Sequence, residues 1–249
     1  LDALCRRASI SLWSFFGGAQ KELISDITIP TGSAEHASAA AMQAVSSGFE
    51  TLKVKVGGMP FEHDRARLNA IARAAPTARL VLDANASLSA DAALALLEAL
   101  GHAKSRVALF EQPTGKHDLD GLRRVREQSG VPVAADESAC SAADVLSLIA
   151  ARAVDAINIK TMKCGILAAL DMIAIARAAG LGLMIGGMVE SKLSMTVSAC
   201  LAAGQGGFSF VDLDTPWFLK GAPFTGGWVE ERATLRLDQI ASGHGVNRV

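Results

Sequence analysis

The sequence has little cysteine, no surplus of charge and no long apolar run. The 24 Lys and Arg against 25 Asp and Glu leave a net charge of −1, so no basic surface for nucleic acid is expected. No apolar run reaches the ~18 residues of a membrane span, and no membrane partner is expected. The four cysteines form no CxxC pair and no cluster, which argues against a disulfide scaffold or a zinc site and favours a reduced cytoplasm. They are Cys5, Cys140, Cys164 and Cys200.

One segment, near the start, has some features of a targeting signal. Arg6 and Arg7 precede an apolar stretch from Ile10 to Phe16, as in a signal peptide. Serines interrupt that stretch and no initiator Met precedes it, so a signal peptide is the less favoured interpretation. Because that Met is missing, we expect the chain to begin inside a larger protein.

Half of the residues are hydrophobic, which is enough for a large core and excludes a disordered chain. Short apolar runs alternate with Ala-rich amphipathic stretches, and this predicts eight strands and seven intervening helices. The strands are expected at 24–29, 51–56, 79–83, 107–111, 131–135, 156–160, 182–185 and 208–212. The helices are expected at 34–47, 62–75, 90–101, 119–128, 141–151, 167–178 and 192–203.

The predicted strands are continuously apolar, as in Leu80-Val81-Leu82, and this suits a parallel sheet that is buried on both faces. Alternating strands and helices form either a closed barrel or an open doubly wound sheet. No GxGxxG follows the first strand, and the repeat fills a length close to the ~250 residues of a typical barrel. We therefore predict an α/β fold, a TIM-like (β/α)7β barrel.

Acidic residues end three consecutive predicted strands, at the edge where barrel enzymes carry their chemistry. Asp83, Glu111 and Asp136 follow one another at spacings of 28 and 25 residues. Neighbouring strands lie ~4.8 Å apart, so three unpaired carboxylates would repel and raise one another's pKa. An all-oxygen set suits a hard divalent cation and predicts Mg²⁺, with Mn²⁺ as the alternative. The competing interpretation is that each acid pairs with a lysine or caps a helix.

Lysines occupy the ends of two other strands. Lys53 and Lys55 are two apart and therefore point to the same face, while Lys160 ends the sixth strand, roughly across the barrel, with Lys163 just after it. An amine on each side of a metal-bound carboxylate suits removal of the α-proton by one lysine and its return to the other face by the second. The metal would stabilise the enediolate dianion, and the stereocentre would invert. Solvated amines and simple ion pairs are the structural alternatives.

Five short motifs together resemble those of the enolase superfamily, muconate-lactonizing subgroup, over the whole chain. They are Lys53-Val54-Lys55, Asp83-Ala84-Asn85, Glu111-Gln112-Pro113, Ala135-Asp136-Glu137-Ser138 and Asn158-Ile159-Lys160. The resemblance implies that the three acids bind Mg²⁺ and that Lys55 and Lys160 are the acid/base catalysts. It also implies that Lys53 helps to bind the substrate carboxylate and lowers the pKa of Lys55.

The segment Asp212-Leu213-Asp214-Thr215-Pro216 is similar to the Asp-x-Asp motif of dipeptide epimerases, including L-Ala-D/L-Glu epimerase. In those enzymes the two aspartates bind the free α-ammonium of the dipeptide, and two acids at one strand end suit a cation. The stretch 159–165 is also close to that pattern, and the resemblance implies that Lys163 helps to bind the substrate. Glu190 is expected near the site or in a supporting position. A helix cap or a surface turn is the structural alternative for the aspartates.

The resemblance implies a Mg²⁺-dependent epimerase whose partner is a small dipeptide. The alternatives are a cycloisomerase, an o-succinylbenzoate synthase, an N-acyl amino acid racemase or a truncated inactive barrel. Members of the subgroup carry an N-terminal α+β capping domain, most of which is expected to be absent here. We expect residues 1–22 to be its remnant, 23–220 the barrel and 221–249 a C-terminal segment packing towards the cap. The dipeptide side chains stay open, and the apolar composition is compatible with a homo-oligomer.

Overall fold

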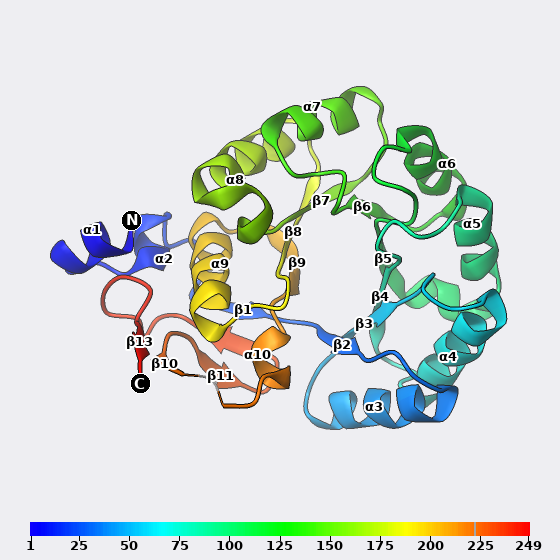
Figure 1. Cartoon of the computed structure of the whole chain (residues 1–249), viewed down its shortest axis with the longest axis horizontal. Helices are drawn as coiled ribbons and strands as arrows, with labels where there is room; N and C mark the ends of the chain where they lie inside the picture. The colour runs from blue at the N-terminus through cyan, green and yellow to red at the C-terminus, as the bar shows by residue number, and fades with distance from the viewer. Residues whose placement is uncertain (222) are drawn as a thin grey trace.

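Eight parallel strands form a nearly closed barrel in the computed structural model, which describes residues 1–221 and 223–249 (Figure 1). The strands follow chain order around the sheet, and each pairs in parallel with the next. They are β2 Ile27–Ile29, β3 Thr51–Lys55, β4 Arg79–Asp83, β5 Val107–Glu111, β6 Val133–Ala135, β7 Ala156–Ile159, β8 Gly182–Gly186 and β9 Phe208–Asp212.

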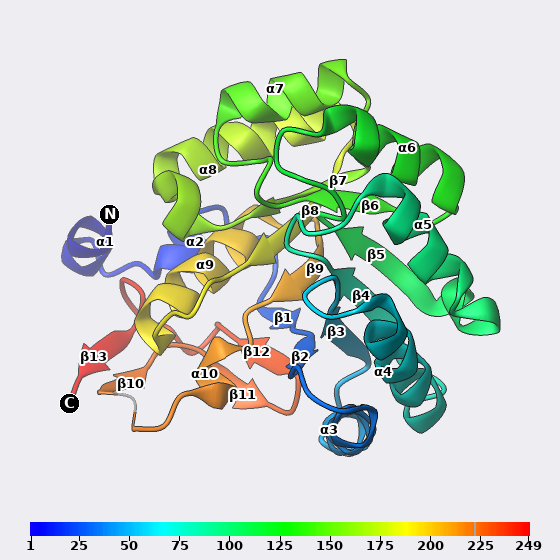
Figure 2. The ribbon, with the colours of Figure 1, turned by 45° about the vertical axis from the view of Figure 1, so that its right-hand side comes forward.

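Seven α-helices connect these strands and lie outside the ring (Figures 1 and 2). Ser33, Ser89 and Ser141 cap three of them, since each side chain accepts the backbone N–H three residues on. The predicted (β/α)7β order is therefore confirmed. The helices are α3 Ala34–Ser46, α4 Phe61–Ala74, α5 Ala90–Glu98, α6 Leu119–Ser129, α7 Ala142–Ala150, α8 Thr161–Ala178 and α9 Lys192–Gln205, with a 3₁₀ helix, η1 Gly101–Arg106, after α5.

The strand predicted at 24–29 is wrong as a single element. Its first residue, Ile24, ends β1, Glu22–Ile24, which pairs antiparallel with β12, Thr234–Arg236, in a small separate sheet. The chain then crosses to the barrel, and the N–H of Asp26 donates to the carbonyl of Val211 at 2.8 Å. The polar pair Ser25-Asp26 marks this crossing because its backbone groups bond outside any strand ladder.

Single hydrogen bonds, and not a strand ladder, close the barrel between β2 and β9 in the described residues. In the described part of the chain, the strand ladders run from β2 round to β9 without joining these two strands. Besides the bond from Asp26, the N–H of Thr28 donates to Oδ2 of Asp214 at 2.6 Å. One carboxylate at the carboxyl end of β9 thus helps to hold β2 in place.

The two ends of the chain lie on one side of the barrel, next to α9 (Figures 1 and 2). The N–H of Leu12 donates to the carbonyl of Gly243, and the N–H of Gly243 donates to the carbonyl of Ile10. These contacts tie the first helices to the C-terminal segment. The elements outside the barrel are α1 Asp2–Arg7, α2 Leu12–Phe15, α10 Thr215–Phe218, β10 Phe224–Gly226, β11 Val229–Glu231 and β13 Val246–Arg248.

Apolar side chains fill the barrel interior below its carboxyl edge. A buried cluster separate from the large core between strands and helices consists of Val81, Leu109, Ala134, Ala156 and Met184. Each comes from a different strand, β4 to β8, so the lumen is a packed plug rather than a pore. Among the helices described for residues 1–221 and 223–249, none combines the length and the apolar character that a bilayer crossing demands.

Candidate active site

The strand period places the predicted acids directly above the apolar plug. Val81 faces the lumen, and Asp83, two residues later on β4, points the same way. Leu109 and Glu111 have the same relation on β5. Both carboxylates are fully buried, and Asp136, just after β6, is only 2% exposed. Charged groups buried this deeply need partners.

Lys53 lies at the centre of these acids. Its Nζ is 2.5 Å from Oδ2 of Asp212, 2.8 Å from Oε2 of Glu111 and 3.0 Å from Oδ2 of Asp83. Burial opposes the ammonium form, but attraction by Asp212, Asp83 and Glu111 outweighs it and raises the pKa of Lys53 well above its ordinary value. Lys53 is therefore a permanent cation that links the carboxylates.

Glu111, one of the predicted metal ligands, has one carboxylate oxygen that accepts no hydrogen bond from the described residues. Its Oε1 accepts a hydrogen bond from Nδ2 of Asn158 at 2.7 Å, whereas among the described residues no donor hydrogen-bonds the buried Oε2, which lies 2.8 Å from Nζ of Lys53. Burial and the charge of Asp83 raise the pKa of Glu111 to about 7. Oxygen ligands of this kind fit a hard divalent cation such as Mg²⁺, which Glu111, Asp83 and Asp136 could hold, although lysine ammoniums contact all three carboxylates here and their oxygens do not all lie within 4.8 Å of one another.

Two lysines contact Asp136. Nζ of Lys160 lies 2.6 Å from Oδ2 of Asp136, and attraction by Glu111 and Asp136 outweighs burial and raises the pKa of Lys160. Nζ of Lys163 donates to Oδ1 and to the carbonyl of Asp136, and also to the carbonyl of Asn158. All three ammonium protons of Lys163 are thereby used within the protein. This geometry makes Lys163 a support for Asp136.

Lys55 and Lys160 line the same cavity, whose volume is about 490 Å³. Lys55 is about one-third exposed, and its Nζ contacts Oδ2 of Asp83 at 2.6 Å and Oδ1 of Asn85 at 2.9 Å. Lys160 reaches the cavity from the end of β7, four strands away in the sheet. The other polar lining residues are Thr28, Lys53, Asn85, Asp212, Asp214 and Thr215, and the apolar ones are Pro30, Met188, Val189, Phe218 and Leu219.

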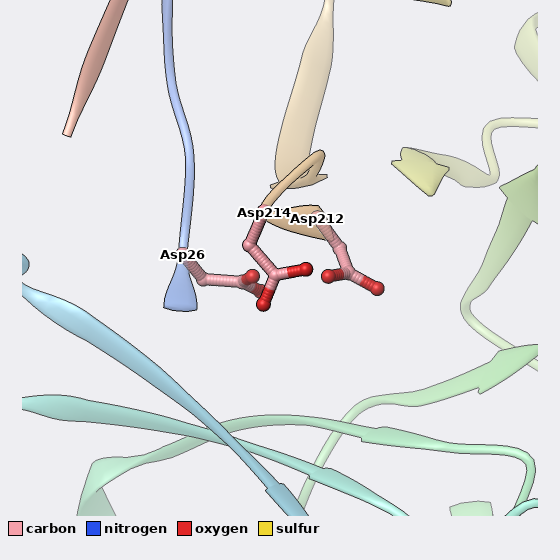
Figure 3. A group of neighbouring side chains, drawn as sticks. All are labelled: Asp26, Asp212 and Asp214. Atoms are coloured by element: carbon pink, nitrogen blue, oxygen red, sulfur yellow. The ribbon is translucent and has the colours of Figure 1, made fainter. Parts of the chain in front are cut away.

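The two aspartates at the end of β9, Asp212 and Asp214, lie with a third acid that the sequence did not predict. Figure 3 shows Asp26, which precedes β2, pointing towards Asp212 and Asp214. Carboxylate oxygens of the three lie within 4.8 Å of one another, and all three residues are buried. Asp26 is not among the residues that line the cavity, so it stands behind the pair. The signal that could have found it is an acid interrupting an apolar run.

Crowding perturbs two of these three carboxyls. Burial and then the charge of Asp212 raise the pKa of Asp26 well above its ordinary value. The same two causes raise the pKa of Asp214 to about 6, although the N–H of Thr28 acts in the opposite direction. The described residues give Oδ1 of Asp26 no hydrogen-bond partner. The raised pKa values mean that Asp26 and Asp214 hold their protons more readily than ordinary carboxyls, and a ligand cation beside them would favour the charged form.

Glu190 is buried, but it is not among the residues that line the cavity. Its Oε1 accepts the backbone N–H of Met188 at 2.8 Å, and its Oε2 accepts the hydroxyl of Ser194. Met188 and Val189 line the cavity. Glu190 therefore shapes the loop after β8.

The chain resembles known proteins along almost its whole length. A family model described as "Enolase C-terminal domain-like" matches residues 36–248. An aromatic dipeptide epimerase from Herpetosiphon aurantiacus is 50% identical over 99% of this chain and 69% of its own. A solved mandelate racemase/muconate lactonizing enzyme from Roseiflexus sp. is 56% identical, with a TM-score of 0.97, over 100% of this chain and 71% of that one.

A second solved structure shows a relative with its ligands. Dipeptide epimerase from Enterococcus faecalis V583, complexed with Mg and the dipeptide L-Leu-L-Tyr, is 38% identical with a TM-score of 0.93. The match covers 99% of this chain and 70% of that one. The chain thus spans about 70% of the length of these three proteins.

Proposed function

The chain belongs to the enolase C-terminal domain-like family, and from that premise we propose that it is the catalytic barrel of a Mg²⁺-dependent dipeptide epimerase. The observation that carries this proposal is one cavity lined by Lys55, Lys160 and the pair Asp212 and Asp214. Two amines suit proton transfer at a carbon between them, and two acids suit a free α-ammonium. A dipeptide has both features in one small molecule.

In the proposed reaction Lys55 and Lys160 act on opposite faces of the α-carbon. One lysine, as the free amine, accepts the α-proton on its Nζ, and the other, as ammonium, delivers a proton to the opposite face. Asp136 and Glu111 favour the ammonium form of Lys160, which suits it to deliver that proton. The roles exchange when the other epimer is the substrate. The net result is inversion of one stereocentre with no loss of atoms.

The remaining groups bind and orient the substrate. Asp83, Glu111 and Asp136 would hold Mg²⁺, which supplies positive charge to the substrate carboxylate when it is bound. Lys53, which is positively charged and lines the same cavity, adds a second cation near that carboxylate. Asp212 and Asp214 pair with the α-ammonium at the other end of the substrate.

The acid pair favours a dipeptide over other substrates of this family. A cycloisomerase, an o-succinylbenzoate synthase or an N-acyl amino acid racemase acts on a molecule without a free α-ammonium. Such a substrate would bring no cation to the buried carboxyl of Asp214, whereas Asp212 would still pair with Lys53, and burial of a carboxylate without a cationic partner is costly.

A panel of free dipeptides with Mg²⁺, followed by NMR of the α-protons or by polarimetry, tests the proposal on the protein that carries this chain. We expect epimerisation of at least one free dipeptide and none of its N-acetyl derivative. Turnover of N-acyl amino acids in preference to every free dipeptide would overturn the proposal.

A further inference from the structure

Helix α4 holds a buried ion pair beneath the proposed base Lys55. We propose that Arg67 and Asp64 are positioning residues that fix the backbone of Lys55, so that they serve one of the two proton-transfer steps and not the other. The inference rests on the proposed function. Both side chains are almost fully buried, with exposed fractions of 1% for Arg67 and 2% for Asp64.

Arg67 joins the ends of two neighbouring barrel strands. Its Nη1 donates to the carbonyl of Lys55, the last residue of β3, at 3.0 Å. Its Nη2 donates to the carbonyl of Pro30, just after β2, at 3.2 Å. Pro30 and Lys55 both line the cavity. One planar guanidinium therefore sets the spacing of two cavity walls, which a flexible ammonium would not do as well.

Asp64 secures the residues that follow Lys55. Its Oδ2 accepts the backbone N–H of Gly57 at 2.6 Å, and its Oδ1 lies 3.3 Å from Nη1 of Arg67. Gly57 has a φ of +82°, and a Cβ there would stand 2.2 Å from Oγ of Ser87. The turn after β3 thus packs tightly on the loop after β4, and its backbone is fixed at the carbonyl of Lys55 and at the N–H of Gly57.

The side chain of Lys55 contacts the end of β4 and the loop that follows it. Asn85 accepts a hydrogen bond from Nζ of Lys55, and Asp83 does so from the end of β4. A change in the β3 turn would therefore shift both the backbone of Lys55 and the partners of its amine. Misplacement of a reacting group by about 1 Å can cost about 100-fold in rate.

A buried ion pair is weak evidence of a contribution to stability, because desolvation of both charges offsets their attraction. What is specific about this pair is its location. Its contacts go to Lys55, Pro30 and Gly57. Lys160 instead contacts Asp136, which directly follows β6. Substitution of Arg67 or Asp64 should therefore slow proton transfer by Lys55 more than proton transfer by Lys160.

Exchange of the α-proton with D₂O measures the two bases separately. Each lysine removes the α-proton of the epimer that faces it, and can return a deuteron from solvent to the same face. With Mg²⁺ and each pure epimer of an accepted dipeptide, early deuterium uptake reports Lys55 in one case and Lys160 in the other. The variant Lys55→Ala identifies which epimer depends on Lys55.

In Arg67→Met we expect uptake into the epimer that depends on Lys55 to fall roughly 10- to 100-fold. Uptake into the other epimer should stay within about threefold of wild type, because Lys160 is untouched. Arg67→Lys should recover part of the loss, since it keeps the charge but not the two-pronged contact. If Arg67→Met does not fold, Asp64→Asn is the variant to measure, with the same inequality.

The matched control is Arg106→Met. Arg106, like Arg67, donates to backbone carbonyls, but to three of them, those of Ala72, Ala75 and Ala78, at and just beyond the C-terminal end of α4. It should slow neither epimer selectively, even if it lowers the melting temperature. An equal decrease for both epimers in Arg67→Met, or no decrease, would overturn the positioning role. Absence of exchange in the wild-type protein would instead reject the proposed function.

Discussion

Nζ of Lys53 lies 2.5 Å from Oδ2 of Asp212, and the same ammonium contacts Asp83 and Glu111. One buried cation therefore joins the acids proposed to bind Mg²⁺ to the acids proposed to bind the substrate ammonium. The two ends of the substrate site are coupled through a side chain that is only 1% exposed.

The first prediction concerns that cation. Lys53→Met should lower the free energy of unfolding by roughly 3–5 kcal/mol, because it leaves buried carboxylates without their partner. Urea denaturation followed by circular dichroism measures the change. Lys104→Met is the control: Lys104 pairs with the exposed Glu98, and its loss should cost about 0–1 kcal/mol. Equal effects of the two substitutions would contradict the central place given to Lys53.

The second prediction concerns recognition of the ammonium. Asp214→Asn keeps the shape and the acceptor for the N–H of Thr28 but removes the charge. A charged hydrogen bond is worth about 1.5–3 kcal/mol, so KM for a free dipeptide should rise roughly 10- to 150-fold. Steady-state kinetics measure it. A variant with unchanged KM would show that the ammonium binds elsewhere.

The third prediction is a pH dependence of binding. The pKa of Asp214 is raised to about 6, so its carboxyl is neutral below that pH and charged above it. KM for a free dipeptide should therefore fall as pH rises through about 6, and Asp214→Asn should flatten this step. A step of equal size and position in the variant would assign it to another group.

The same shift predicts a stability change of opposite sign. In the unfolded chain this carboxyl has its ordinary pKa of 3.8, so between 3.8 and about 6 the folded state binds more protons. Its contribution to folded stability is present at low pH and is lost as pH rises through about 6. Melting temperatures of wild type and Asp214→Asn should thus diverge in favour of the variant with rising pH. Parallel curves would argue against a raised pKa.

The barrel and most of its site follow from local sequence patterns. On β4 and β5 the inward residue two positions before the charged strand end is apolar, Val81 before Asp83 and Leu109 before Glu111, so a buried strand with a charged tip is visible in the sequence. The topology then brings the tips together. The three acids, the lysines on β3 and after β7, and the aspartates at the end of β9 could all be placed in this way.

Other features depend on contacts between distant segments. Asp26 lies where a strand was predicted, and only the crossing from β1 to β2 brings it behind Asp214. Lys163 follows a strand end like the other site lysines, yet its three protons are used by Asp136 and Asn158. Arg67, on a helix, carries no signal that its guanidinium reaches two strand ends. Hydrogen-bond partners of this kind are determined by the tertiary packing of distant segments and not by the spacing of residues along the sequence.

The most direct test of the account is exchange of the α-proton of a free dipeptide with D₂O in the presence of Mg²⁺. We predict deuterium uptake from both epimers by the wild-type protein, loss of uptake for one epimer in Lys55→Ala, and loss for the other epimer in Lys160→Ala. Removal of Mg²⁺ with EDTA should abolish uptake in both cases. Full exchange of both epimers in either alanine variant would contradict a mechanism with one lysine on each face.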